Sequence, residues 1–176
     1  MILTAVAQPR QLVNGETFDG KIGLWRVMEE RVCLRTTLYH NRDDVYSHDC
    51  NMDAGLYRQF MTNECAYGDS FDGVFGQIKL KMPNVRNITV VIRQDGAKPH
   101  TGRGNLDFLR ERGQRDGFNI TVVTQPAQSP DMNINDLGLF RSLKCRVAHA
   151  WLVDERRSLE AMMEKIDELW QEYDYD

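Results

Sequence analysis

The chain has 176 residues, enough for one domain with a buried core, and 41% of them are hydrophobic and 27% charged. No apolar run approaches the roughly 18 residues of a membrane-spanning helix, and the opening string MILTAVAQPR lacks the basic and apolar regions of a secretory signal. The formal net charge of -4 excludes a chain-wide basic surface of the kind that binds nucleic acid without sequence preference.

These features predict a single intracellular domain over residues 1–176 with no membrane partner. The four cysteines are widely spaced and form no C-x-x-C pair, which is typical of reduced thiols. The histidines His40, His48 and His149 lack the spacing of a structural zinc cluster.

The first half of the chain is expected to start with a hairpin. The run MILTAVA predicts a buried strand at residues 2–7, and residues 21–29 are expected to return beside it. Residues 35–55 are polar and rich in turn formers, which predicts a long loop leading to a helix with Asp53 as its N-cap. Apolar residues at three- and four-residue steps then predict two helices separated near Gly68.

The second half carries the strongest strand pattern. The strings NITVVIRQD and FNITVVTQP share Asn-Ile-Thr-Val-Val, and the segment between them predicts a short helix ended by Gly117. This order predicts a β-α-β unit with two parallel strands. Two helices are expected to complete the chain, and the C-terminal one, within 153–176, has an apolar stripe at helical spacing. The predicted fold class is therefore α/β.

Three acids follow the two predicted parallel strands. Asp95 ends the first strand, and Asp131 and Asp136 follow the second strand in the loop AQSPDMNIND. Carboxylates at the carboxyl ends of neighbouring strands can share a Mg²⁺ ion, which prefers oxygen ligands. Each acid also has a structural interpretation, because Asp95 can cap the helix that follows, Asp131 can form an Asx-turn and Asp136 can be an N-cap. Spacing alone leaves both interpretations open.

The string RQDGAKPHT, followed by QPAQSPDMNINDLGLFRSL, resembles the second and third acidic motifs of mariner-like transposases. These proteins belong to the DDE superfamily of endonucleases, of DDE or DDD type. In that family the second catalytic Asp lies in a strand-terminal Gln-Asp-Asn-Ala-x-x-His motif. The motif maps onto Gln94, Asp95, Gly96, Ala97 and His100, with Gly96 where Asn is usual.

The family's third acid lies five residues beyond the Asp of a Ser-Pro-Asp motif. It therefore falls on Asp136 and leaves Asp131 with a structural role. The string Asp-Leu-Gly-x-Phe that begins at Asp136 is similar to the branch of the family that uses Asp as its third acid. The strings ILTAVAQPR and FDGKIGLW are similar to strands that follow the first acid, so the resemblance covers nearly the whole chain.

The resemblance implies a ribonuclease-H-like mixed sheet flanked by helices. It implies that Asp95 and Asp136 are catalytic and bind two Mg²⁺ or Mn²⁺ ions during DNA strand cleavage and strand transfer. His100 would be an accessory residue that orients a phosphate or a water, and Lys98 would meet a phosphate. A structural histidine and an exposed lysine are the competing interpretations. The implied partner is transposon-end DNA, and the implied compartment is the nucleus.

The resemblance also implies an incomplete catalytic core. The family's first acid lies in a segment like Asp-Glu-Lys-Trp ahead of an opening strand, and residues 1–50 contain no such segment, since Asp19 matches a loop position. We therefore expect a truncated catalytic domain that is inactive alone. Without the opening strand, the strands at 2–7 and 87–95 pair directly, or another chain such as a second copy in a homodimer fills the edge, or the isolated product is marginally stable and prone to aggregate.

Two alternative hypotheses remain for the chain as a whole. One is a catalytically silent, transposon-derived remnant that acts at most as a binding or interaction module. The other is an unrelated nucleotide-binding domain, which the sequence disfavours because it contains no G-x-G-x-x-G or Walker-type lysine pattern.

Overall fold

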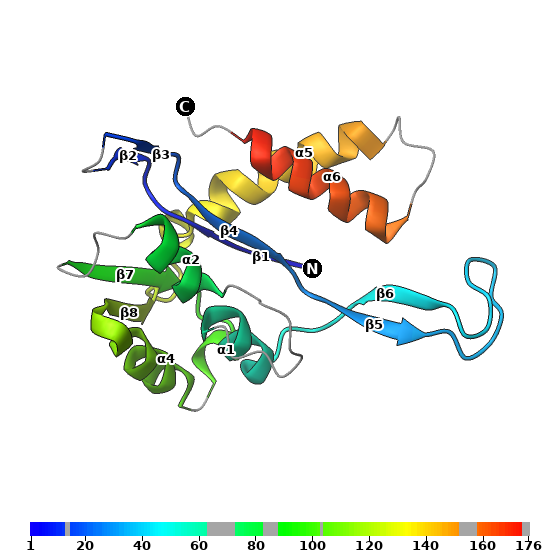
Figure 1. Cartoon of the computed structure of the whole chain (residues 1–176), viewed down its shortest axis with the longest axis horizontal. Coiled ribbons are helices and arrows are strands. Elements are labelled where there is room, and N and C mark those ends of the chain that lie inside the picture. The colour runs from blue at the N-terminus through cyan, green and yellow to red at the C-terminus, as the bar shows by residue number, and fades with distance from the viewer. Residues whose placement is uncertain (13–14, 63–72, 83–87, 103, 152–157, 174–176) are drawn as a thin grey trace. The chain divides into compact units, whose positions relative to one another are not determined.

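The computed structural model describes residues 1–12, 15–62, 73–82, 88–102, 104–151 and 158–173, and it has a mixed α/β fold with small sheets and helices (Figure 1). The described strands are β1 (Ile2–Val6), β2 (Arg10–Gln11), β3 (Thr17–Phe18), β4 (Lys21–Arg26), β5 (Met28–Val32), β6 (Val45–Asp49), β7 (Thr89–Gln94) and β8 (Asn119–Thr124). The described α-helices are α1 (Ala54–Thr62), α2 (Val74–Lys81), α3 (Lys98–Thr101), α4 (Asn105–Gly113), α5 (Phe140–Trp151) and α6 (Leu159–Glu172).

The described residues group into two compact units. The first unit comprises Met1–Leu3, Leu24–Asn51 and Phe140–Tyr173. The second contains the described parts of Thr4–Gly23 and Met52–Leu139. The chain passes between the units within β1 and within β4. This division does not decide whether residues 1–176 form the single domain that the sequence predicts, which stays a prediction.

Each unit has its own buried hydrophobic core. In the first unit the buried hydrophobic residues are Trp25, Val27, Cys33, Leu143, Ala161, Met163, Leu169 and Trp170. In the second unit they are Phe18, Ile22, Tyr57, Phe60, Met61, Val74, Phe75, Ile78, Met82, Leu109, Phe118, Ile120, Val122 and Leu139. The predicted site residues all belong to the second unit.

The predicted pairing of the first strand with residues 21–29 is confirmed, with β1 paired to β4 and β4 ending at Arg26. A backbone hydrogen bond from Ala7 N–H to the carbonyl of Gly20, 2.8 Å long, closes one end of this pair. Gly20 has a φ of +89°, and a Cβ atom at this position would lie 2.5 Å from the carbonyl oxygen of Ala7. Glycine is therefore the residue that this turn requires.

The long loop predicted over 35–55 is wrong for residues 45–49, which form β6. This strand pairs antiparallel with β5, with Met28 opposite Asp49 and Val32 opposite Val45. Most side chains of the two strands are exposed or half-buried. No apolar alternation marks such a hairpin in the sequence, because backbone pairing rather than side-chain burial holds the two strands together.

Helices α5 and α6 run side by side in opposite directions in the first unit (Figure 1). The hydroxyl of Ser158 caps α6 by accepting a 3.1 Å hydrogen bond from the N–H of Ala161. The apolar stripe predicted on this helix places Met163 and Trp170 in the core, at 1% and 5% exposure. The stripe is therefore a packing face. No helix in the described part of the chain has the length and apolar character needed to cross a bilayer.

Helices α1 and α2 confirm the two helices predicted in the middle of the chain. Asp53 caps α1 as predicted, because its Oδ1 accepts a 2.8 Å hydrogen bond from the N–H of Leu56. The predicted break near Gly68 lies outside the described residues. Both helices belong to the second unit, where they contact each other.

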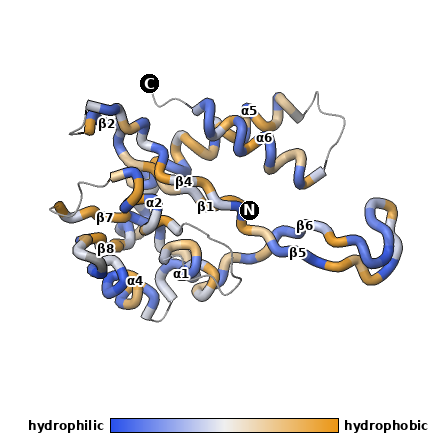
Figure 2. Tube along the Cα trace, viewed as in Figure 1, coloured by the Kyte–Doolittle hydropathy of each residue, from blue (hydrophilic) through white to orange (hydrophobic). Residues whose placement is uncertain are grey.

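Strands β7 and β8 confirm the predicted β-α-β unit. They pair in parallel, with Thr89 opposite Asn119 and Gln94 opposite Thr124, so their carboxyl ends are level. Helix α4 lies between them in sequence and packs against β8. Figure 2 shows hydrophobic residues through both strands. The interface between helix and strand is fully buried, since Leu109 and Ile120 both have 0% exposure.

Strand β7 has no second partner strand among the described residues. It pairs with β8, whereas β1 pairs with β4, so the direct pairing of β1 with β7 that was one expected outcome does not occur. Val91 in β7 is 55% exposed and Ile88 just before it is 50% exposed. Parallel sheets are normally covered on both faces, and an open edge with exposed apolar residues can pair with a further strand.

The close packing of α4 on β8 predicts a large effect of a single methyl group. A Cβ atom at Gly113 would lie 2.0 Å from the carbonyl oxygen of Ile120. We expect Gly113→Ala to lower the free energy of unfolding by about 1–3 kcal/mol, measured by urea denaturation. The matched control is Gly138→Ala, because no heavy atom of another segment lies within 4 Å of the place that its Cβ would take. The control should change stability by less than about 0.5 kcal/mol, and equal effects of the two variants would contradict this packing.

Candidate functional site

Asp95 lies directly after β7, at the carboxyl end of the parallel pair. Its Oδ1 accepts a 2.9 Å hydrogen bond from the N–H of Ala97 and lies 2.5 Å from Nδ1 of His100. The first contact is an Asx-turn just before α3, whose N-cap is Ala97 without a side-chain cap hydrogen bond, so the interpretation of Asp95 as the cap of this helix is wrong. The side chain of Asp95 remains 37% exposed, and Oδ2 makes no hydrogen bond to any described residue. Among the described residues, one carboxylate oxygen is therefore engaged and the other is not.

A buried tyrosine fixes the surroundings of this carboxylate. Tyr57 in α1 is 3% exposed, and its hydroxyl donates a 2.6 Å hydrogen bond to Oε1 of Gln94. Gln94 in turn donates from Nε2 to the backbone carbonyl of His100 over 3.1 Å. The rings of Tyr57 and His100 also contact each other, with centroids 4.2 Å apart. Sequence reasoning missed Tyr57, because a tyrosine on the buried face of a helix carries no signal of a polar role.

Burial raises the pKa of the Tyr57 hydroxyl well above its ordinary value, and the negative charge of Asp95 raises it further. The hydroxyl therefore stays protonated at physiological pH and remains a hydrogen-bond donor to Gln94.

A second buried polar residue anchors the short helix α3. Asn105 at the start of α4 is completely buried, and its Nδ2 donates a 2.7 Å hydrogen bond to the backbone carbonyl of Pro99. Its Oδ1 accepts a hydrogen bond from Nε of Arg58 in α1. This amide thus connects three helices, which holds α3 and His100 in place. Lys98, also in α3, is exposed, as its competing structural interpretation expects.

Asp136 lies in a π-helical turn, Asn135–Leu139, that precedes α5. It is exposed, and its Oδ2 accepts a 2.6 Å hydrogen bond from Nδ2 of Asn133. The N–H of Asp136 donates a 3.4 Å hydrogen bond to Oδ1 of Asn133. Asn133, three residues earlier, is therefore in the capping position, and the interpretation of Asp136 as an N-cap is wrong. Asp131, in the 3-10 turn Pro130–Met132, is exposed as well.

The two predicted catalytic acids belong to the same unit and follow neighbouring parallel strands. A 2.8 Å hydrogen bond from the N–H of Gln125 to the carbonyl of Gln94 continues the pairing beyond the strand ends. No hydrogen bond or shared partner joins Asp136 to Asp95 among the described residues. In the same part of the chain, no three His, Cys, Asp or Glu side chains gather closely enough to hold a metal ion.

Three buried oxygen atoms of the second unit have no hydrogen-bond partner within the described structure. They belong to Thr4 in β1, Thr124 at the end of β8 and Asn135 beside Asp136. Asn135 uses its Nδ2 to donate to the backbone carbonyl of Thr4 over 3.3 Å, which leaves its Oδ1 unused. Buried polar atoms normally have partners, so these oxygens are sites where a further donor would be stabilising.

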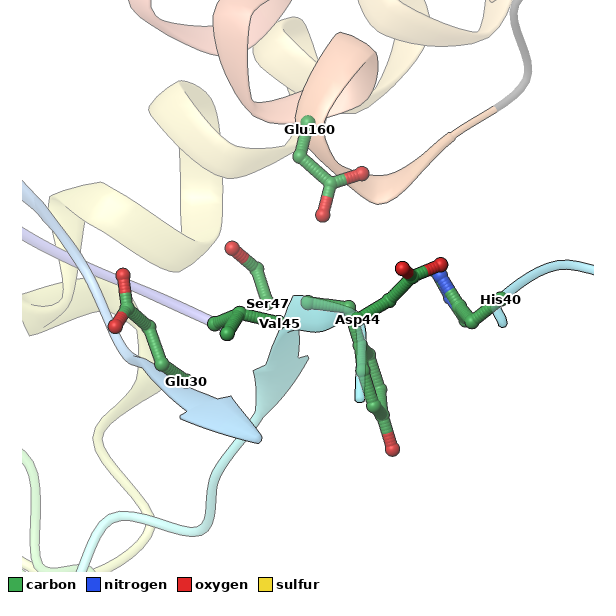
Figure 3. Close-up of a pocket in the computed structure, with 7 residues that line it drawn as sticks. Glu30, His40, Asp44, Val45, Ser47 and Glu160 are labelled. Atoms are coloured by element: carbon green, nitrogen blue, oxygen red, sulfur yellow. The ribbon is translucent and has the colours of Figure 1, made fainter. Parts of the chain in front are cut away.

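A separate polar pocket of about 400 Å³ lies in the first unit (Figure 3). Glu30 in β5, Asp44 just before β6 and Glu160 in the first turn of α6 bring carboxylates to it. His40 lines the pocket too, and its ring stacks on Tyr46 with centroids 4.5 Å apart. The carboxylate of Asp44 accepts a 2.6 Å hydrogen bond from the backbone N–H of Asn41. None of the predicted catalytic residues lies in this pocket.

Comparison with models of known protein families, with curated proteins and with solved structures gives no match to this chain. Its function is therefore inferred from the residues and contacts of the site itself.

The raised pKa of Tyr57 predicts a pH dependence of stability. A pKa that is higher in the folded state stabilises the fold below the ordinary value of about 10, and this contribution is lost as pH rises above it. In an absorbance titration at 295 nm, we expect the difference between the wild type and Tyr57→Phe to stay flat through pH 10. The difference should appear only when the protein unfolds. A difference curve with an ordinary tyrosine midpoint would show that this hydroxyl is accessible to water.

Proposed function

We propose that this chain is the C-terminal part of the catalytic domain of a mariner-like DNA transposase, with a ribonuclease-H-like fold. The observation that carries the proposal is the level parallel pair of β7 and β8, with Asp95 directly after the first strand and Asp136 in the segment after the second. The matching motifs around both acids support it. In an open α/β sheet this edge is where ligands bind.

The carboxylates of Asp95 and Asp136 would be the metal ligands of this site. Both side chains are accessible, and carboxylate oxygens are the ligands that Mg²⁺ and Mn²⁺ prefer. The ions would supply activation of a water or of a DNA 3′-hydroxyl, and charge stabilisation at the phosphodiester. His100 would keep Asp95 oriented, and Lys98 would approach a phosphate from α3.

DNA at transposon ends, in the nucleus, is the partner that this proposal implies. With a net charge of -4, the chain would meet DNA through local cations, and Arg93 and Lys98 flank Asp95 with exposed side chains. The first acid of the family, which residues 1–176 do not contain, would have to be supplied from outside them, for example by a complementing polypeptide or a second copy. A strand from that chain would pair with the open edge of β7, and this edge is the observation that favours such a partner.

The proposal predicts that both acids contribute to divalent-metal affinity. In a Mn²⁺ titration followed by electron paramagnetic resonance, Asp95→Asn and Asp136→Asn should each weaken binding about tenfold or more, because each removes an anionic ligand. The matched control is Asp131→Asn, which changes an exposed acid of the same loop and should bind Mn²⁺ like the wild type. Circular dichroism verifies that each variant is folded. Equal affinities for the wild type and all three variants would rule out this metal site.

The incomplete set of acids predicts that the isolated chain lacks nuclease activity. The purified protein should leave supercoiled DNA uncut in the presence of Mg²⁺ or Mn²⁺, because it has only two of the three carboxylates that the family uses. Robust cleavage that is abolished by Asp95→Asn would contradict this prediction. It would show that a substitute third ligand exists within the chain.

The second candidate function is a silent, transposon-derived interaction module. The observation that favours it is the structural use of Asp95, whose Oδ1 accepts the Ala97 N–H of the Asx-turn and contacts Nδ1 of His100. The exposed apolar residues Val91 and Ile88 then mark the binding surface. The Mn²⁺ titration separates the two functions, because the module requires no metal affinity at either acid.

A further inference from the structure

Four residues of the second unit form a closed set of contacts around one carboxylate. Tyr57 donates to Gln94, Gln94 donates to the backbone of His100, and the ring of His100 contacts both Asp95 and Tyr57. Gln94 and Asp95 are consecutive in the chain, so the backbone closes the set. Each member is held by at least two contacts, and Tyr57 and Gln94 are buried at 3% and 8% exposure.

We propose that Tyr57 and Gln94 are positioning residues that hold the His100 ring with a proton on Nδ1, and thereby fix which oxygen of Asp95 faces a ligand. The Nδ1 atom of His100 lies 2.5 Å from Oδ1 of Asp95, and a carboxylate oxygen can only accept. Nδ1 must therefore carry the hydrogen. This leaves Nε2 as an acceptor when the ring is neutral, and it leaves Oδ2 as the oxygen of Asp95 open to a cation.

The amide of Gln94 is the element that makes this arrangement specific. Its Oε1 accepts from the Tyr57 hydroxyl at 2.6 Å, and its Nε2 donates to the His100 carbonyl at 3.1 Å. Rotating the amide by 180° would place its oxygen against the carbonyl oxygen of His100, where two acceptors repel each other. It would also place the NH₂ group against the Tyr57 hydroxyl, whose proton would then need another acceptor. One orientation satisfies both neighbours, because the His100 carbonyl can only accept and therefore faces the NH₂ group, and the Tyr57 hydroxyl then donates to the amide oxygen and holds the Gln94 side chain in place.

The contact between the Tyr57 and His100 rings restrains the imidazole itself. The Tyr57 and His100 ring planes are tilted by 34° with their centroids 4.2 Å apart, which limits rotation of the imidazole about χ2. Tyr57→Phe keeps this contact and removes only the hydroxyl. The substitution therefore separates the hydrogen-bond contribution of Tyr57 from its packing.

The inference rests on the proposed function only for the consequence that concerns a metal ion. The state of His100 is testable without any metal, by long-range ¹H–¹⁵N correlation spectra of the imidazole. In the wild type we expect hydrogen on Nδ1 of His100 and slow exchange of that proton. A wild-type histidine with hydrogen on Nε2 but not on Nδ1, or one that averages the two tautomers, would overturn the inference directly.

The variants test whether Tyr57 and Gln94 cause this state. Tyr57→Phe should produce averaged tautomers and faster exchange of the Nδ1 proton, while a thermal melt verifies the fold. The control Tyr39→Phe removes the hydroxyl of an 82% exposed tyrosine and should leave the His100 signals unchanged. Unchanged His100 signals in Tyr57→Phe would overturn the positioning role. If Tyr57→Phe does not fold, Gln94→Met provides the same comparison, because it removes both hydrogen bonds with a side chain of similar length.

Metal binding distinguishes this inference from the proposed function. We expect Tyr57→Phe to weaken Mn²⁺ binding by about tenfold, the lower end of the effect of removing a group that orients a ligand. If the wild type binds no Mn²⁺ but Tyr57→Phe still alters the His100 tautomer, the metal site fails and the positioning role stands. If Mn²⁺ binds and neither the tautomer nor the affinity responds to Tyr57→Phe, the positioning role fails and the metal site stands.

Discussion

The close contact between helix α4 and strand β8 is the constraint on which the rest of the second unit depends. Two parallel strands need a crossover connection, and that connection must pack on the sheet to bury its apolar residues. Gly113 allows the helix to approach within a distance that any side chain would prevent. The helix packs on β8, and β8 pairs in parallel with β7 so that the two carboxyl ends are level.

That register gives Asp95 two roles that compete for the same side chain. The carboxylate follows β7 and accepts the N–H of Ala97 in an Asx-turn just before α3, so the backbone uses one of its oxygens. The same oxygen holds His100, whose position depends on Tyr57 and Gln94. A half-exposed carboxylate in water would rotate freely, whereas this one is oriented before any ligand arrives. Preorganisation of this kind is what a metal ligand needs, and it is equally compatible with a purely structural turn.

The open edge of β7 links the fold to the proposed function. Sheets of two strands leave edges unpaired, and a parallel pair with exposed apolar residues is an incomplete hydrophobic unit. The buried, unpartnered oxygens of Thr4, Thr124 and Asn135 belong to the same unit. Under the proposed function, a further polypeptide segment would pair with the open edge of β7 and supply the missing acid.

The sequence by itself determined the strands and helices whose side chains are buried on a regular period. The repeated string Asn-Ile-Thr-Val-Val predicted the parallel pair, and Asp53 predicted the start of α1. Both features depend on hydrophobicity and capping by residues that are close together in the sequence. Only the tertiary structure decided the β5–β6 hairpin, since its residues are largely exposed and backbone pairing holds it together. Only the tertiary structure brought Tyr57 from α1 onto His100, because a contact between residues far apart in the chain leaves no periodic signal in the sequence. The identity of the acid at the strand end was therefore readable in advance, and the set of side chains that orients it was not.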